Sequence, residues 1–269
     1  MEQEIKRLFF AFEIHAPWPE SLPPGRWIQE DLRHLTLSFL GNISFPELQK
    51  QLPSIPLPSF HIGKAGFFDR CLFLPLRYPH AVAWNIQWLD NKNSINLYQE
   101  ELSQWLLLHN FIHKKNHRDF SAHVTLARPP FHPKEWTKSF SPLPLYADRL
   151  HLYESLGYSQ YRSLWSFSLL PPFTEIEHTA DIAFHVYGTT IQELYQHAEL
   201  ALCFQFPSLL PFRKPLENPT NLETVITQLN ASIAHADAEI GCPFKGVSFH
   251  EKIEQTSQQI YKWEMIVDV

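Results

Sequence analysis

Polar and apolar residues alternate in one short stretch that occurs twice along the chain. Residues 34–37 read His-Leu-Thr-Leu, and residues 123–126 read His-Val-Thr-Leu. Alternation with a period of two is typical of a half-buried β-strand, whose successive side chains point to opposite faces. Each copy should therefore present an imidazole and a hydroxyl on one face and two aliphatic side chains on the other. Because two such copies rarely arise by chance, the repeat is the main signal in the sequence.

The pattern around this repeat predicts a first unit of mixed α and β structure. Gly41-Asn42 reads as a turn that ends the first His-Thr strand, and Gly66 as part of a loop. The order of the elements suggests two related lobes that face each other, with helices packed on antiparallel sheets. Further strands are expected at residues 7–14, 60–62, 71–74, 81–86, 148–154 and 163–169, and helices at 46–52, 93–110 and 133–138.

A second unit is predicted to begin after Pro171-Pro172. Thr190 and Glu193 form a capping box at the start of an amphipathic helix. The chain thus divides into residues 1–170 and a small α+β unit at residues 173–269. In the second unit strands are expected at residues 173–178, 183–187, 245–252 and 260–269, with another helix through 222–233.

Composition limits the function classes. The chain has 269 residues, of which 44% are hydrophobic and 19% charged, as in a globular protein. Its net charge of −6 argues against polyanion binding by the whole surface, so any nucleic-acid contact must be local. Three scattered cysteines fit a reducing compartment, and no apolar run reaches the length of a signal or membrane segment. We therefore expect a cytoplasmic protein without a membrane partner.

The repeated motif indicates acid–base chemistry on a phosphate. Two imidazoles that face each other across a cleft can take and give protons near neutral pH. The hydroxyls of Thr36 and Thr125 can donate hydrogen bonds to phosphate oxygens, and Arg128 can add positive charge. This set requires no metal and favours phosphodiester cleavage. The alternative is that His34 and His123 are structural residues on two strands.

Residues 34–41, preceded by Arg26-Trp27, and residues 120–129 resemble the two motifs of RNA 2′,3′-cyclic phosphodiesterases, also called 2′-5′ RNA ligases, of the two-histidine phosphoesterase superfamily. Residues 7–12 resemble the opening strand, and the resemblance covers roughly residues 5–170. It implies a bilobal α+β fold in which two antiparallel sheets with outer helices surround a central cleft. It also implies hydrolysis of a terminal RNA 2′,3′-cyclic phosphate to a 2′-phosphomonoester, with water as nucleophile.

By this resemblance His34 and His123 are the catalytic pair, and Thr36 and Thr125 bind the phosphate without any cofactor. We assign His123 as the base that activates water and His34 as the acid for the 3′ oxygen. Ser38 stands where the family often has a basic residue, which puts one phosphate contact in question. The same pair would also suit 2′-5′ RNA ligation or hydrolysis of a small cyclic nucleotide.

A basic segment precedes the second motif, at residues 113–119. Lys114, Lys115 and Arg118 can attract an RNA backbone beside the cleft. Solvated surface charge is the equally weighted alternative.

The second unit resembles archease, a small cytosolic protein that assists the RNA-splicing ligase. Residues 177–190 resemble its opening, and residues 245–250 and 266–269 resemble its later strand and acidic C-terminus, with a shortened central part. The resemblance implies a divalent metal, often calcium, held by Asp181 and Asp268, with Glu177 as a possible ligand. Lys245 matches a functional lysine.

Both resemblances concern the same RNA end, because the archease-assisted ligase also consumes 2′,3′-cyclic phosphates. We therefore expect a phosphodiesterase joined to a shortened archease-like domain, linked to RNA and tRNA ligation, with the RNA-splicing ligase as a possible partner. A reading from another class is a non-enzymatic ligase partner whose first unit only binds RNA ends.

Overall fold

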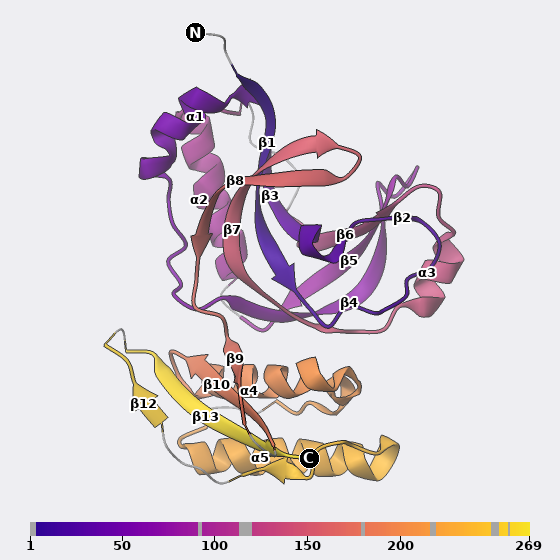
Figure 1. Cartoon of the computed structure of the whole chain (residues 1–269), viewed down its shortest axis with the longest axis vertical. Coiled ribbons are helices and arrows are strands. Elements are labelled where there is room, and N and C mark those ends of the chain that lie inside the picture. The colour runs from indigo at the N-terminus through magenta and orange to yellow at the C-terminus, as the bar shows by residue number, and fades with distance from the viewer. Residues whose placement is uncertain are drawn as a thin grey trace.

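The computed structural model describes residues 4–90, 93–112, 120–178, 181–215, 219–248, 253–257 and 259–269. Figure 1 shows two units stacked along the long axis, the first above the second. The strands of the first unit are β1 (Ile5–His15), β2 (Arg26–Trp27), β3 (His34–Ser44), β4 (Lys64–Leu74), β5 (Ala81–Trp88), β6 (His123–Arg128), β7 (Pro144–Gly157) and β8 (Gln160–Ser168). Its helices are α1 (Phe45–Gln51), α2 (Ser94–Leu108) and α3 (Pro133–Ser139), with short 3₁₀ turns η1 (Glu30–Leu32) and η2 (Leu52–Ser54).

All strands of the first unit belong to one sheet. The strand order is β1-β3-β6-β5-β4-β7-β8, and β2 pairs with β6. Because β1 also pairs with β7, six of these strands close into a ring. The prediction of two separate sheets is therefore wrong, although the strands still form two lobes, one of β1, β3, β7 and β8 and the other of β2, β4, β5 and β6.

Two seams of unequal length join the lobes. The longer seam pairs β4 with β7 over four residues of each strand, from Lys64 opposite Ala147 to Phe67 opposite Pro144. The shorter seam is a single antiparallel pair between β3 and β6, Leu35 opposite Val124. The short seam is where the two His-Thr strands meet, one contributed by each lobe.

Two glycines lie within strands although the sequence suggested a turn and a loop. Gly41 has a φ of +74° and lies at a register shift between β1 and β3, so β3 bends there and continues to Ser44. Gly66 is part of β4. A Cβ at this position would lie 2.6 Å from the carbonyl oxygen of Gln87 on the paired strand, so the close approach of the two backbones requires glycine here. The strand predicted at residues 60–62 is reduced to one isolated bridge.

The period-two pattern separates a core face from a second face of the sheet. In β1 the side chains of Phe10 and Phe12 are fully buried in the main core, which also contains Leu102 and Leu106 of α2. The intervening residues Phe9, Ala11 and Glu13 face the other way, and the first two join a small separate cluster with Tyr153. Packing of α2 on the core face thus leaves the opposite face free for chemistry.

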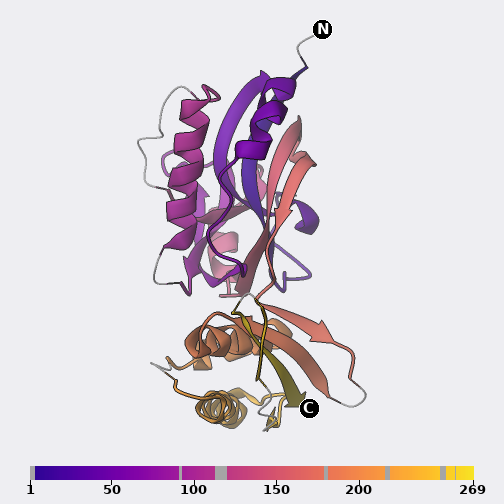
Figure 2. The same cartoon turned by 90° about the vertical axis from the view of Figure 1, so that its left-hand side faces the viewer.

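The second unit is a small sheet covered by helices, and Figure 2 shows both helices on the same side of its strands. As predicted, Thr190 caps α4, its hydroxyl accepting a hydrogen bond from the backbone N–H of Glu193 at 3.0 Å. The sheet order is β11-β13-β10-β9, with β12 on β13. The elements are β9 (Phe173–Ile176), β10 (Ile182–Gly188), α4 (Ile191–Gln205), η3 (Pro207–Phe212), α5 (Leu222–Ile240), β11 (Gly246–Val247), β12 (Ile253–Gln255) and β13 (Tyr261–Asp268).

Aromatic rings and one charged side chain link the two units. Tyr146 of β7 packs against Phe173 and Phe204, with ring centroids 5.5 and 5.3 Å apart. The Nζ atom of Lys64 in β4 lies 3.9 Å from a carboxylate oxygen of Glu193 in α4. In the described part of the chain, no helix combines the length and the apolar character needed to cross a membrane.

Candidate active site

The short seam brings the two repeated motifs onto one face of the sheet. Leu35 lies opposite Val124 in antiparallel register, and both are fully buried. One step along the strands, His34 comes opposite Thr125 and Thr36 opposite His123, on the face away from the two aliphatics. Directly opposed side chains start about 5 Å apart and diagonal ones about 7–8 Å apart. The four predicted site residues thus form a compact set, with the two histidines on its diagonal.

Both histidines are held in the same tautomer by the same local contact. Nδ1 of His34 donates to the carbonyl oxygen of Leu32, and Nδ1 of His123 donates to that of Ser121, each at 2.7 Å. A carbonyl oxygen can only accept, so the proton of each neutral ring lies on Nδ1. Nε2 of each ring therefore keeps its lone pair for an incoming proton.

Burial and charge keep both imidazoles neutral. Burial lowers the pKa of His34 to about 4, and the positive charge of Arg128 and the neighbouring His123 and His151 act in the same direction. Burial also lowers the pKa of His123, with Arg128 again adding to the effect. At neutral pH both rings are free bases until a negatively charged group arrives and favours protonation.

A register shift turns Arg128 toward the motif residues. Thr125 pairs with Ala83 and Ala127 with Val82, so Leu126 is an extra residue in β6. Such a bulge re-aims the side chains that follow it. Leu126 and Ala127 are both fully buried in the core, so Arg128 returns to the opposite face, that of His123 and Thr125. Its guanidinium donates a hydrogen bond to the carbonyl oxygen of His80 at 3.4 Å, and its charge lowers the pKa of both imidazoles.

Three aromatic rings surround His34 on the side of its own lobe. The ring centroids of Phe9 and Tyr161 lie 5.0 Å from that of His34, and the centroid of Tyr153 lies 5.6 Å away. Tyr161 meets the imidazole edge-on, at 89°. These three rings form an aromatic cage, which explains why His34 is more strongly desolvated than His123.

A third histidine continues this face behind the cage. His151 is 7% exposed, its Nε2 lies 3.2 Å from the carboxylate of Glu13, and its Nδ1 lies 2.8 Å from the hydroxyl of Ser163. The contact with His151 is the main cause that lowers the pKa of Glu13. Arg149 also lies 3.4 Å from the Glu13 carboxylate, so the group stays ionised and paired.

The sequence reasoning missed Glu13, His151 and the aromatic cage. A signal was present for His151, because it alternates with Leu150 and Leu152, which are fully buried. The contacts among β1, β7 and β8 depend on strand pairing, so no local pattern predicts which partner each side chain meets.

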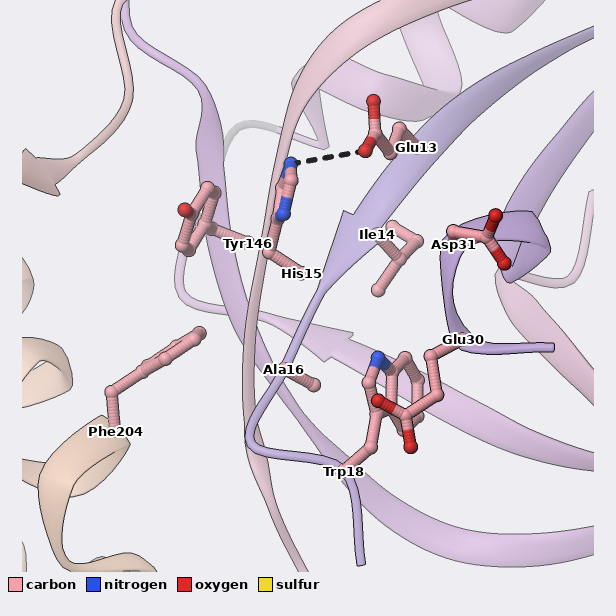
Figure 3. A pocket seen from close by; sticks show the side chains of 9 residues that line it. All are labelled: Glu13, Ile14, His15, Ala16, Trp18, Glu30, Asp31, Tyr146 and Phe204. Carbon is pink, nitrogen blue, oxygen red and sulfur yellow. Dashed lines mark ion pairs between the residues drawn. The ribbon is translucent and has the colours of Figure 1, made fainter.

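A pocket of about 350 Å³ lies where the two units meet. Figure 3 shows Glu13 pointing toward His15 on one side and Phe204 of α4 on the other. Glu13, Glu30 and Asp31 line it, so its charge disfavours a phosphate. The phosphate chemistry expected from the motifs belongs to the His-Thr face and not to this pocket.

The structure brings together part of the metal site predicted in the second unit. Ile182 pairs with Val267, so Asp181, just before β10, and Asp268, in β13, follow that pair at the same end of the two strands. The carboxylate of Asp181 lies 3.7 Å from Nδ1 of His178. The hydroxyl of Ser248 donates to both carboxylate oxygens of Asp268, at 3.1 Å each, and Lys245 Nζ donates to the carbonyl oxygen of Val269 at 2.6 Å. Glu177 is exposed beyond the end of β9.

These residues do not form a complete cation site. Within the described ranges no group of three or more His, Cys, Asp or Glu side chains lies close enough to hold a metal ion. Two carboxylates alone fit a calcium ion poorly, since it takes six to eight oxygen ligands. The basic segment at residues 113–119 and parts of the archease-like motifs, residues 179–180 and 249–250, lie outside the described residues.

The chain is similar to known proteins over part of its length. No family model matches the chain. It is 27% identical over 143 residues, 48% of this chain and 70% of the relative, to an RNA 2′,3′-cyclic phosphodiesterase of Thermotoga maritima.

Among solved structures, E. coli LigT complexed with 3′-AMP matches 62% of this chain and 99% of its own, at 23% identity and a TM-score of 0.46. A Thermus thermophilus protein, TT0787, matches 61% and 97%, at 22% identity and a TM-score of 0.44. None of these named relatives is an archease, so the archease-like nature of the second unit stays a prediction.

Proposed function

We propose that the first unit hydrolyses terminal RNA 2′,3′-cyclic phosphates to 2′-phosphomonoesters by acid–base catalysis with His34 and His123. The observation that carries the proposal is the pairing of Leu35 with Val124, which gathers both imidazoles and both threonine hydroxyls on one face. The similarity to the Thermotoga maritima phosphodiesterase supports the same chemistry.

In the proposed reaction water attacks phosphorus while the bond from phosphorus to the 3′ oxygen breaks. One imidazole takes a proton from water, and the other gives a proton to the departing 3′ oxygen, which leaves a 2′-phosphate and a 3′-hydroxyl. Attacking and leaving oxygens stand in line on opposite sides of phosphorus. Two Nε2 atoms on the diagonal of the four-residue set suit this arrangement, and Thr36, Thr125 and Arg128 would bind the remaining phosphate oxygens.

The pKa directions bear on how the two imidazoles work. A general acid must carry a proton at the working pH, and a pKa of about 4 keeps His34 unprotonated. Burial and the charge of Arg128 lower the pKa of His123 as well, so the ring that acts as the acid must gain its proton when the anionic phosphate binds. Because the pKa of both rings is shifted in the same direction, these shifts do not separate the roles, and the proposal keeps His123 as the base that activates water and His34 as the acid for the 3′ oxygen.

An RNA oligonucleotide with a 2′,3′-cyclic end tests the proposal. The purified protein should convert it to a 2′-phosphate end, identified by ³¹P NMR, and His34→Ala should abolish the conversion. A 2′-5′ linked product from two RNA ends would support the ligase alternative. Turnover of only a small cyclic nucleotide would support the alternative that the protein is a cyclic-nucleotide phosphodiesterase. Binding of the RNA end without any reaction would leave the non-enzymatic reading.

For the second unit we propose an archease-like role in RNA ligation, supported by the placement of Asp181 and Asp268 at one end of β10 and β13 and by Lys245 at the same edge. Calcium titration by isothermal calorimetry tests the metal part of this proposal. Binding heat in the wild type that is lost in Asp268→Asn would show that these carboxylates hold calcium despite the incomplete ligand set, whereas equal heats in both would remove them from consideration. Capture of an RNA-splicing ligase by the full chain tests the partner.

A further inference from the structure

Four arginines in the described part of the chain have no carboxylate within 4.0 Å, namely Arg7, Arg26, Arg77 and Arg128. The other described arginines all have one, at distances from 2.6 to 3.8 Å. An arginine kept exposed and unpaired on a protein of net charge −6 is free to meet an anionic partner.

Three of these four arginines gather at one rim of the second lobe. Arg26 of β2 lies directly opposite Arg128 of β6 in antiparallel register. Arg77 lies in the β4–β5 loop, residues 75–80, and the guanidinium of Arg128 donates to the carbonyl oxygen of His80 in that loop. The rim thus begins at Arg128, whose charge acts on both candidate catalytic imidazoles, and extends outward from there.

Two exposed aromatic side chains directly follow two of these arginines in the chain. Trp27 follows Arg26 in β2 and is 50% exposed, and Tyr78 follows Arg77 and is 68% exposed. The guanidinium of Arg77 lies 5.8 Å from the centre of the Tyr78 ring. Exposed aromatics interleaved with cations are the pattern with which proteins bind single-stranded nucleic acid, because bases stack on the rings and phosphates meet the cations.

We propose that this rim, Arg26, Trp27, Arg77, Tyr78 and Arg128, binds the single-stranded RNA that leads up to the cyclic phosphate. The inference rests on the proposed function and extends it from the reacting phosphate to the nucleotides on its 5′ side. It predicts that the preferred substrate is an RNA end of several nucleotides and that the RNA is unpaired there.

A competing route would run over the first lobe. Phe39 of β3 is 65% exposed and packs on Phe9, with ring centroids 5.7 Å apart. This ring lies beyond Thr36 on the same strand, at the end of the site away from Arg128. Because three of the four unpaired arginines lie at the opposite end and only Arg7 lies near Phe39, we assign Phe39 to the terminal nucleotide and the rim to the strand.

Substrate length separates the two routes. The test compares kcat/KM for adenosine 2′,3′-cyclic monophosphate with kcat/KM for a hexanucleotide that carries the same cyclic end. Arg77→Ala and Tyr78→Ala should each lower the ratio of hexanucleotide to mononucleotide about tenfold. Arg70→Ala and Tyr158→Ala, an exposed arginine and an exposed tyrosine outside the rim, are the matched controls and should keep the ratio.

Binding provides a readout that needs no turnover. For a fluorescent hexanucleotide with a 3′-phosphate, Arg77→Ala should weaken binding and lower the slope of log Kd against log salt by about 0.7. The inference is overturned if the ratio and the slope do not change in the rim variants, if the controls change equally, or if only Phe39→Ala lowers the ratio. If the wild type does not turn over either substrate but its RNA binding shows the expected salt dependence, the proposed reaction is contradicted while the RNA-binding surface remains supported.

Discussion

His34 and His123 occupy equivalent places in a repeated motif, yet their surroundings differ. Both rings donate from Nδ1 to the carbonyl oxygen two residues earlier in the chain, so the motif itself fixes the tautomer. His34 is then enclosed by Phe9, Tyr153 and Tyr161 of its own lobe. His123 has no such aromatic contact in the described residues and lies in the lobe that carries three of the four unpaired arginines.

This difference separates what the motif supplies from what each lobe supplies. The motif gives two imidazoles with the same tautomer, while burial and charge set how easily each is protonated. Three aromatic rings cover the His34 imidazole on one side, whereas unpaired arginines lie in the lobe that carries His123. The two imidazoles thus have different surroundings, which suits a reaction that needs both an acid and a base.

Removal of either ring should have the largest effect. His34→Ala and His123→Ala should each lower kcat on the cyclic RNA end about 10³-fold, since each step loses its proton-transfer group. Rates are measured by product analysis on the hexanucleotide. His61→Ala, an exposed histidine away from the motifs, is the control, and retention of full activity in either motif variant would contradict the paired role.

Arg128 should matter to both ends at once. Arg128→Ala should lower kcat/KM about 10²-fold because it loses a charged phosphate contact. The pKa values of both imidazoles should rise, because the arginine lowers both of them in the folded protein. NMR titration of the imidazole C–H signals measures this, with Arg70→Ala for comparison, and a rise at only one histidine would argue against a shared position.

The threonines test whether the two halves hold the phosphate equally. Thr36→Val and Thr125→Val each remove one hydroxyl donor while keeping the branched shape. Each should lower kcat/KM about tenfold. A large loss at one position and none at the other would mean that a single motif binds the phosphate.

A further effect, on stability and not on rate, concerns the cage around His34. Its pKa is about 4 in the folded protein, against about 6.5 for an unfolded chain. Between these values the unfolded state binds the extra proton, so the free energy of unfolding rises with pH in this window and is unaffected by this group above it. The whole change amounts to about 3 kcal/mol. Urea denaturation at pH 4.5 and 7 should show a smaller difference for His34→Gln than for wild type or His132→Gln.

The repeated motif was predictable because its information is local. Alternation along residues 34–37 and 123–126 gave the strands, the buried faces of Leu35 and Val124, and the shared face of each histidine and threonine. The helices α2 and α4 and the cap at Thr190 followed from periodicity and capping residues in the same way.

The closure of the sheet and the surroundings of the site were not predictable. Pairing of β1 with β7 joins residues some 140 positions apart, as in Glu13 opposite Arg149, and a local pattern carries no record of it. Gly41 looked like a turn residue, but the pairing of β1 with β3 on both sides of it makes it a bulge. The placement of Arg128 also depends on a register shift that only the paired strand β5 reveals.

The central claim is that the two imidazoles act on one phosphate. NMR titration of the protein with adenosine 2′-monophosphate, the product expected from a terminal adenosine, tests it most directly. The account predicts that the imidazole signals of His34 and His123 shift with one common binding curve and that the pKa of both rings rises in the complex. A response of only one ring, or separate curves for the two, would contradict it.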